Sequence, residues 1–221
     1  MKKSIRVAII GPGNLEFYYQ KLQKISKKKL ESELEKIAKA LIEADVEIVL
    51  VPDKGIDMEI ARKYKKQRGR RVIGTIPKSD KRYGINHLKS YMEEKINSKN
   101  IFDEFIDSGD WKEQSRLRGF FGDVVLSLGI SPGSELEMNY STYLFKLMKG
   151  FKKEVPNLKG VHPQIRANKY VPYTYLIYVP FIKTKRLYPE TEAYLKKYGI
   201  KLEYIKSPKD LKEKLKKLAL F

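Results

Sequence analysis

The chain has 221 residues, enough for one domain with a substantial core, and it contains no cysteine, which excludes disulfides, thiolate zinc sites and iron–sulfur clusters. With two histidines only, we expect no metal site and no resident cofactor. The formal net charge of +19 suggests a polyanionic partner. A heat-adapted surface rich in lysine and glutamate would explain the charged fraction of 33% but not the excess of positive charge.

Strand and helix signals alternate along the sequence from its start. Residues 5–10 form an aliphatic run typical of a buried strand, and residues 30–44 carry apolar side chains at helical spacing. The aliphatic run at residues 5–10 is too short for a signal-peptide core or a membrane span, so we expect a cytoplasmic protein with no membrane partner. The further elements expected in chain order are a strand at 46–51, a helix at 56–67, a strand at 71–76, a helix at 86–96, a short strand at 101–106, a helix at 111–121, a strand at 123–128, a helix at 135–149, a strand at 173–181, a helix at 190–198, a strand at 201–205 and a last helix begun by Ser207 and Pro208.

This alternation predicts the fold class. Apolar strands separated by amphipathic helices are typical of βαβ units, and therefore of a Rossmann-like three-layer α/β/α fold with a mostly parallel sheet. No linker or repeat divides the sequence, so we expect residues 1–221 to form a single domain. Right-handed crossovers place the strand-to-helix loops at one edge of the sheet, where ligands bind in such folds.

The first of these loops is Gly11-Pro12-Gly13-Asn14. Glycines let the backbone approach a bound phosphate closely, although tight turns also use them. The loop lacks the third glycine of the dinucleotide fingerprint, which disfavours NAD and FAD as ligands.

The second loop contains Asp53, Lys54 and Gly55. We expect Asp53 to cap the helix that follows. Lys54 either reaches a phosphate or lies in solvent.

The third loop leads into a helix and predicts an anion site. Gly129, Ser131, Gly133 and Ser134 would present amides and hydroxyls at the positive end of the helix dipole, with Glu137 facing the same crevice. The alternative is a capping box, in which Ser134 is the N-cap and Glu137 reaches back to it.

Four segments together resemble the LOG or "lysine decarboxylase-like" Rossmann superfamily, which also includes the DNA-processing DprA group. They are KGIDMEIA at 54–61, GRRVIGTIP at 69–77, DVVLSL at 123–128 and GISPGSELE at 129–137. The last corresponds to Pro-Gly-Gly-x-Gly-Thr-x-x-Glu in the family, with its leading Pro-Gly-Gly replaced here. The resemblance covers most of the chain.

The LOG branch consists of phosphoribohydrolases, which cleave the N-glycosidic bond of nucleoside 5′-monophosphates. The resemblance implies that Glu137 is the motif glutamate acting on that bond and that Gly133 and Ser134 bind phosphate. The family's upstream arginine aligns with Gln114, and Arg116 and Arg118 lie close by in the sequence. Of these two we take Arg116 as the candidate catalytic arginine.

Three functional hypotheses follow. The leading one is a protein that binds a phosphorylated, nucleotide-like or phosphoribosyl ligand, with or without catalysis. The alternatives are a phosphoribohydrolase using Glu137, and a DprA-like nucleic-acid-binding protein, which the net charge motivates but the scattered basic runs do not favour. By analogy and by base rate we expect a homodimer.

Overall fold

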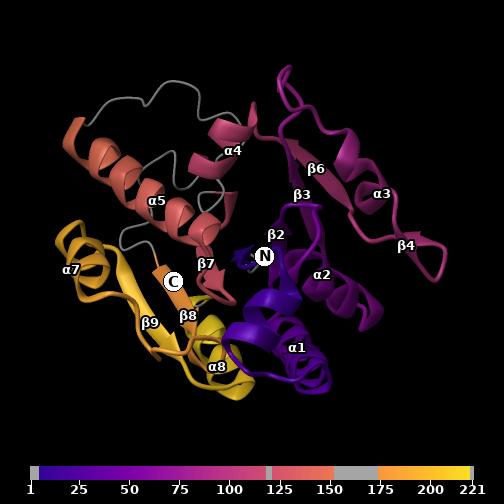
Figure 1. Ribbon diagram of the computed structural model, residues 1–221, viewed down its shortest axis with the longest axis horizontal. Helices are drawn as coiled ribbons and strands as arrows, with labels where there is room; N and C mark the ends of the chain where they lie inside the picture. Colours follow the sequence, from indigo (N-terminus) through magenta and orange to yellow (C-terminus); the bar gives the residue numbers. More distant parts are fainter. Residues whose placement is uncertain (1–4, 118–120, 152–173, 220–221) are drawn as a thin grey trace.

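The computed structural model of the chain describes residues 5–117, 121–151 and 174–219, which form a seven-stranded sheet between two helical layers (Figure 1). The strand order is β6-β3-β2-β1-β7-β8-β9, and every neighbouring pair is parallel. The expected α/β Rossmann-like fold is confirmed. The strands are β1 (Arg6–Ile10), β2 (Glu47–Leu50), β3 (Val72–Ile76), β6 (Glu104–Asp107), β7 (Val124–Ser127), β8 (Thr174–Tyr178) and β9 (Lys201–Ile205).

The strand order reverses between β1 and β7. From β1 the chain adds β2, β3 and β6 on one side, and it then crosses back to place β7 on the other side. The two strands are in register from the Val7–Val124 pair to the Ile10–Ser127 pair, so both end at the same edge. In open α/β sheets a crevice forms at such a reversal, outside the carboxyl ends of the strands.

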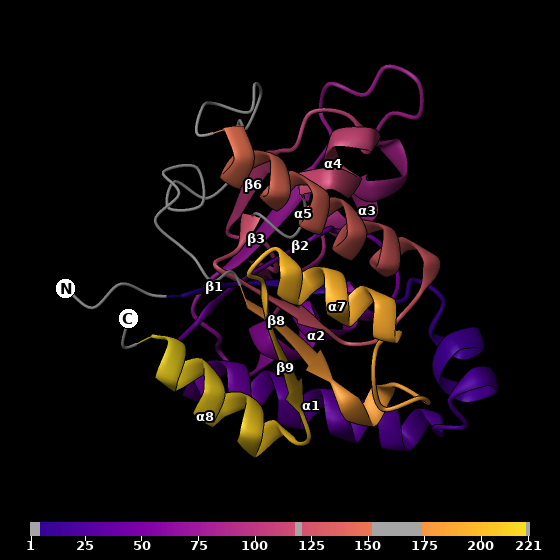
Figure 2. The same ribbon diagram turned by 90° about the vertical axis from the view of Figure 1, so that its left-hand side faces the viewer.

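Helices cover both faces of the sheet (Figure 2). Alternate side chains of β1 serve the two layers: Val7 and Ile9 belong to one apolar cluster, and Ala8 and Ile10 to the other. The first cluster includes side chains of α1 (Lys27–Glu43), α2 (Ile56–Lys66) and α8 (Pro208–Leu218). The second includes side chains of α5 (Pro132–Phe151) and α7 (Pro189–Lys197). The short helix α4 (Trp111–Leu117) packs beside α5.

Serine caps fix the start of two helices. The Ser207 hydroxyl accepts a hydrogen bond from the Asp210 amide at 3.2 Å, which confirms the expected start of α8. The Ser26 hydroxyl accepts one from the Lys29 amide at 3.3 Å, and α1 therefore begins before the expected residue 30. Among the described residues, no helix combines the length and the apolar character needed to cross a bilayer.

The prediction of one helix at residues 86–96 is wrong. The segment forms a short 3₁₀ turn, η2 (Asn86–Leu88), one turn of helix, α3 (Lys89–Met92), and a small hairpin of β4 (Lys95–Ile96) and β5 (Lys99–Asn100). Leu88 is the only buried residue of η2 and α3, so no apolar face stabilises a longer helix. Asn97 and Ser98 both have positive φ, as a tight two-residue hairpin turn requires.

Smaller differences have local causes. Pro180 follows β8 and cannot continue a strand, so the element expected at 173–181 ends at Tyr178 and is followed by a 3₁₀ turn, η4 (Val179–Phe181). The strand expected at residues 101–106 begins three residues later, as β6 (Glu104–Asp107). A π-helix, η1 (Glu16–Leu22), lies between β1 and α1, where no element was expected.

Candidate functional site

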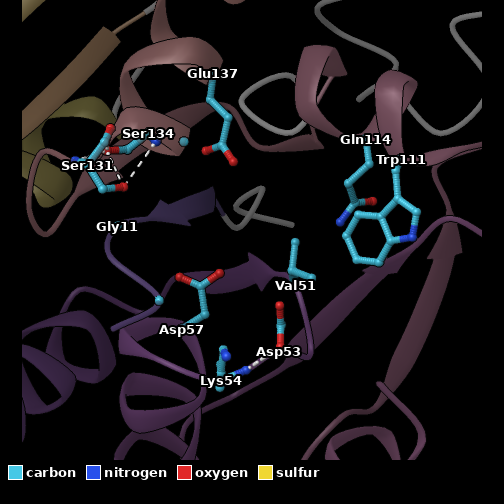
Figure 3. A pocket seen from close by; sticks show the side chains of 12 residues that line it. Gly11, Val51, Asp53, Lys54, Asp57, Trp111, Gln114, Ser131, Ser134 and Glu137 are labelled. Carbon is cyan, nitrogen blue, oxygen red and sulfur yellow. Dashed lines mark hydrogen bonds between the residues drawn. The ribbon is translucent and has the colours of Figure 1, made fainter. Parts of the chain in front are cut away.

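A cavity of about 320 Å³ opens at the carboxyl edge of the sheet, where the loops after β1, β2 and β7 meet α4 (Figure 3). Of the site residues expected from the sequence, seven line it: Gly11, Gly13, Lys54, Ser131, Gly133, Ser134 and Glu137. Five further residues complete the lining: Val51, Asp53, Asp57, Trp111 and Gln114.

The loops after β1 and β2 are in direct backbone contact. A Cβ atom on Gly55 would lie 2.4 Å from the Cα of Gly13, and Gly55 has a φ of 102°. The adjacent Ile56 amide donates to the Pro12 carbonyl at 3.1 Å. Gly55 therefore joins the two loops and is not among the residues that line the cavity.

Gly129 has a similar packing role in the third loop. Its φ is 153°, and a Cβ there would lie 2.8 Å from the ring of Tyr18 and 2.9 Å from Pro12. By contrast, Gly13 and Gly133 have room for a side chain, because their nearest neighbours would be 3.8 Å and 3.9 Å away. These two glycines are the ones that leave the cavity open.

Two buried tyrosines of η1 hold the third loop in place. The Tyr18 hydroxyl accepts from the Ile130 amide at 2.7 Å and donates to the Phe181 carbonyl at 3.1 Å. The Tyr19 hydroxyl donates to the Leu128 carbonyl at 2.5 Å. Burial raises the pKa of both phenols, so they remain protonated donors at neutral pH.

The start of α5 differs from the expected capping box. The helix begins at Pro132, so Ser131 and not Ser134 is the residue that caps it. The Ser131 amide donates to the Ser134 hydroxyl at 2.7 Å, and the Ser134 amide donates back to the Ser131 hydroxyl at 3.3 Å. The fixed φ of proline suits the first helical position, which sets this boundary three residues early. Glu137 lies one turn further along and lines the cavity.

Self-capping leaves one amide of this turn for a ligand. Pro132 has no N–H, and the Ser131 and Ser134 amides are used. The Gly133 amide makes no hydrogen bond to a described residue, and Gly133 is exposed at the cavity.

Carboxylates enter the cavity from two helices. Asp57, the second residue of α2, is only 6% exposed, and Figure 3 shows it on the opposite side of the cavity from Glu137 of α5. Asp53 was expected to cap α2, but its carboxylate accepts from the Lys54 amide at 2.7 Å, and the N-cap residue is Gly55. Lys54 is the one cation among the described residues that line the cavity.

Gln114 occupies the position where the family arginine aligns. It is 2% exposed, and its amide nitrogen donates to the carbonyl and the hydroxyl of Thr75, both at 3.2 Å. Its amide oxygen accepts from the Ser108 hydroxyl. The side chain is thus neutral and fixed to the end of β3.

Two further expected site residues, Asn14 and Arg116, are not among the described residues that line the cavity. The Asn14 side-chain oxygen accepts from the Phe17 amide of η1 at 3.0 Å. Arg116 is in α4, but its side chain, like all of Arg118, lies outside the described residues. Within 5–117, 121–151 and 174–219, no group of three acidic or histidine side chains could hold a metal ion.

Three of the five lining residues that were not expected at the site have a signal in the sequence. Asp57 lies inside a segment that resembles the family, Gln114 aligns with the family's arginine, and Asp53 follows a strand in a loop where a helix cap was expected. Trp111 and Val51 carried no signal, because nothing local indicates that the start of α4 and the end of β2 face the same cavity.

No family model matches the chain, and no curated protein sequence matches it. Solved structures do match over nearly its whole length. A molybdenum cofactor carrier protein from Chlamydomonas reinhardtii is 11% identical with a TM-score of 0.56, covering 99% of this chain and 100% of its own. A molybdenum cofactor binding protein from Rippkaea orientalis is 12% identical with a TM-score of 0.56, covering 99% of both chains. The protein TM1055 is 11% identical with a TM-score of 0.52, covering 96% of this chain and 99% of its own.

The chain shares the Rossmann-like fold of these proteins. The match extends over nearly the whole chain, and the cavity lies at the carboxyl edge of the shared sheet. At 11–12% identity the likeness concerns the fold, so the ligand must be argued from the cavity.

Proposed function

We propose that this LOG-like protein binds a phosphorylated small molecule, a nucleotide or another phosphoribosyl compound, in the cavity between β1, β2 and β7. The observation that carries the proposal is the polarity of the cavity. One side has the amino-terminal turn of α5, and the other walls have carboxylates. A phosphate and a sugar require these two environments.

The phosphate belongs at the start of α5. This helix has 20 residues, so its dipole places partial positive charge at its first turn. The Gly133 amide would donate to the phosphate, and the hydroxyls of Ser131 and Ser134 lie in the same turn. Lys54 supplies the only full positive charge among the described lining residues.

The sugar belongs beside the carboxylates. Asp57 and Glu137 are acceptors on opposite sides of the cavity, and ribose hydroxyls are matching donors. Carboxylates would repel a phosphate placed next to them, so the ligand has one favoured direction in the cavity.

Binding without reaction is favoured over hydrolysis. The family's arginine is replaced by Gln114, whose amide is already bonded to Thr75 and Ser108. The molybdenum cofactor carrier and binding proteins that share the fold support a carrier role for a small ligand here. The molybdenum cofactor is therefore a ligand to test beside nucleotides.

Calorimetric titration with nucleoside 5′-monophosphates and ribose 5-phosphate tests the proposal, with Gly133→Asp compared with Gly133→Ala. An aspartate in the first turn of α5 favours the helix but repels an anion. We expect Gly133→Asp to abolish binding while the protein keeps its thermal stability, and Gly133→Ala to bind measurably. Unchanged affinity in Gly133→Asp would remove the phosphate site.

Hydrolysis is the second candidate, because Glu137 and Asp57 could act on a glycosidic bond held between them. Incubation with nucleoside 5′-monophosphates, followed by chromatography for free base, separates the two functions. We expect no base release. Release that disappears in Glu137→Gln would instead establish a phosphoribohydrolase.

A further inference from the structure

The indole of Trp111 is held rigidly at the start of α4. Its Nε1–H donates to the Gly84 carbonyl at 2.9 Å, and its backbone amide donates to the Asp80 carboxylate at 3.1 Å. His87 stacks on the indole with ring centroids 5.3 Å apart and an angle of 24° between the planes. Asp80 also accepts from the Gly84 amide at 3.1 Å, which ties the supporting loop to the helix.

The indole also borders the cavity. Trp111 is half-buried and lines the cavity, whereas His87 is exposed and does not line it. Figure 3 shows Trp111 across the cavity from Ser131 and Ser134, with Val51 between them. The cavity therefore has an aromatic end, where Gln114 lies beside Trp111, opposite the first turn of α5.

We propose that Trp111 is the wall against which a flat heteroaromatic ring of the ligand packs, so that this residue selects ring-bearing phosphates over plain sugar phosphates. The inference rests on the proposed function, and it adds the residue that sets ligand preference. The order of the cavity walls is phosphate-binding turn, carboxylates and then aromatic ring. A nucleoside monophosphate presents phosphate, sugar and base in this same order.

Rigidity makes the indole suited to this role. The hydrogen bond to Gly84 and the stacked His87 fix the ring before any ligand arrives, so little conformational entropy is lost when a second ring packs on it. Stacking of a base on an aromatic side chain strengthens binding by roughly 5- to 100-fold.

The test uses the full chain and compares adenosine 5′-monophosphate with ribose 5-phosphate by calorimetry. We expect the nucleotide to bind the wild type at least about fivefold more tightly. Trp111→Leu should lose this preference and bind both compounds equally, while Trp111→Phe should keep most of it. Both variants lack the Nε1–H, so the difference between them reports the aromatic face alone. Tyr83→Ala is a control, because Tyr83 is an exposed aromatic of the neighbouring loop that does not line the cavity.

A second readout needs no variant. Trp111 is the only tryptophan of the chain, so its fluorescence reports the site directly. Adenosine 5′-monophosphate should quench it with the dissociation constant found by calorimetry, and ribose 5-phosphate should bind without comparable quenching. Equal wild-type affinities for the two compounds, or a preference that survives in Trp111→Leu, would overturn the role of Trp111 and leave the phosphate site standing. Absence of binding by both compounds would overturn the proposed function as well.

Discussion

The Cα of Gly13 lies where a side chain on Gly55 would begin: a Cβ added to Gly55 would be 2.4 Å from it. Residues 42 positions apart in the chain thus bring the loops after β1 and β2 into backbone contact beneath the cavity. Because this contact tolerates no side chain, the shape of the site depends on it.

Gly55→Ala should therefore destabilise the protein. The φ of 102° is unfavourable for alanine, and the methyl group would displace the loop after β1. We expect the free energy of unfolding to fall by about 2–4 kcal/mol in urea denaturation.

Gly13→Ala is the matched control. The nearest atom to its added Cβ is the Lys54 carbonyl oxygen at 3.8 Å, so stability should change by about 0.5 kcal/mol or less. The methyl group would face the cavity and weaken ligand binding. Equal stability losses in the two variants would contradict the contact described here.

Asp57→Asn should reduce affinity for a ribose-containing ligand by about 10- to 100-fold, the range expected for loss of a charged hydrogen-bond acceptor. Glu59→Gln serves for comparison, because Glu59 pairs with Arg62 at 2.7 Å and does not line the cavity. Calorimetry should show the loss for the first variant alone. The proposed place of the sugar would be wrong if Asp57→Asn bound the ligand as tightly as the wild type.

Tyr18→Phe should loosen the third loop. The variant removes the hydroxyl that accepts from Ile130, leaving that amide without this partner, at a cost of about 1–3 kcal/mol in unfolding free energy. Ligand affinity should fall with it, because the loop leads directly into α5. Tyr194→Phe alters an exposed tyrosine of α7 and should leave both measurements unchanged.

Alkaline pH should destabilise the fold through Tyr64. Its hydroxyl donates to the Val46 carbonyl and accepts from the Arg70 amide, and burial raises its pKa from 10.0 to about 12. A group with a raised folded-state pKa contributes its full stability below the unfolded value and loses it as pH rises through the folded value. Between pH 10 and 12 the free energy of unfolding should fall by about 2 kcal/mol more in the wild type than in Tyr64→Phe. Parallel pH curves for the two proteins would exclude Tyr64 as the cause.

Nucleic-acid binding should be weak and electrostatic. Several surface lysines are paired with glutamates, among them Lys63 with Glu35 at 3.4 Å and Lys212 with Glu43 at 3.0 Å. We expect any affinity for DNA to be similar for single and double strands and to disappear between about 50 and 200 mM salt. Binding that discriminates between single and double strands would instead favour the DprA-like hypothesis.

The parallel sheet could be predicted from sequence because its signals are local. The strands β1, β2, β3, β7 and β8 are short, largely apolar runs, and α1, α2 and α8 carry apolar residues at helical spacing. The segment at 86–96 shows the limit of this reasoning. Its residues permit a helix, but no apolar face packs against the rest of the molecule to stabilise one.

The site was predicted in part, through its loops. Sequence alone indicated Gly13, Gly133 and Glu137, since glycine-rich turns and helix starts after strands are recognisable locally. Gly55 and Gly129, also expected at the site, pack closely against neighbouring loops and are not in the cavity lining, and a glycine required by such packing looks in sequence like one required by a ligand.

By itself, then, the sequence determined the fold class, the sheet edge that carries the site and three of the loops that form it. The tertiary structure alone decided which residues face the cavity. Trp111 enters it from a helix beyond β6, and Tyr18 supports the third loop through Ile130, 112 residues away. Local propensity acts over a few residues, whereas a binding site is made by contacts between distant segments that form only when the chain has folded.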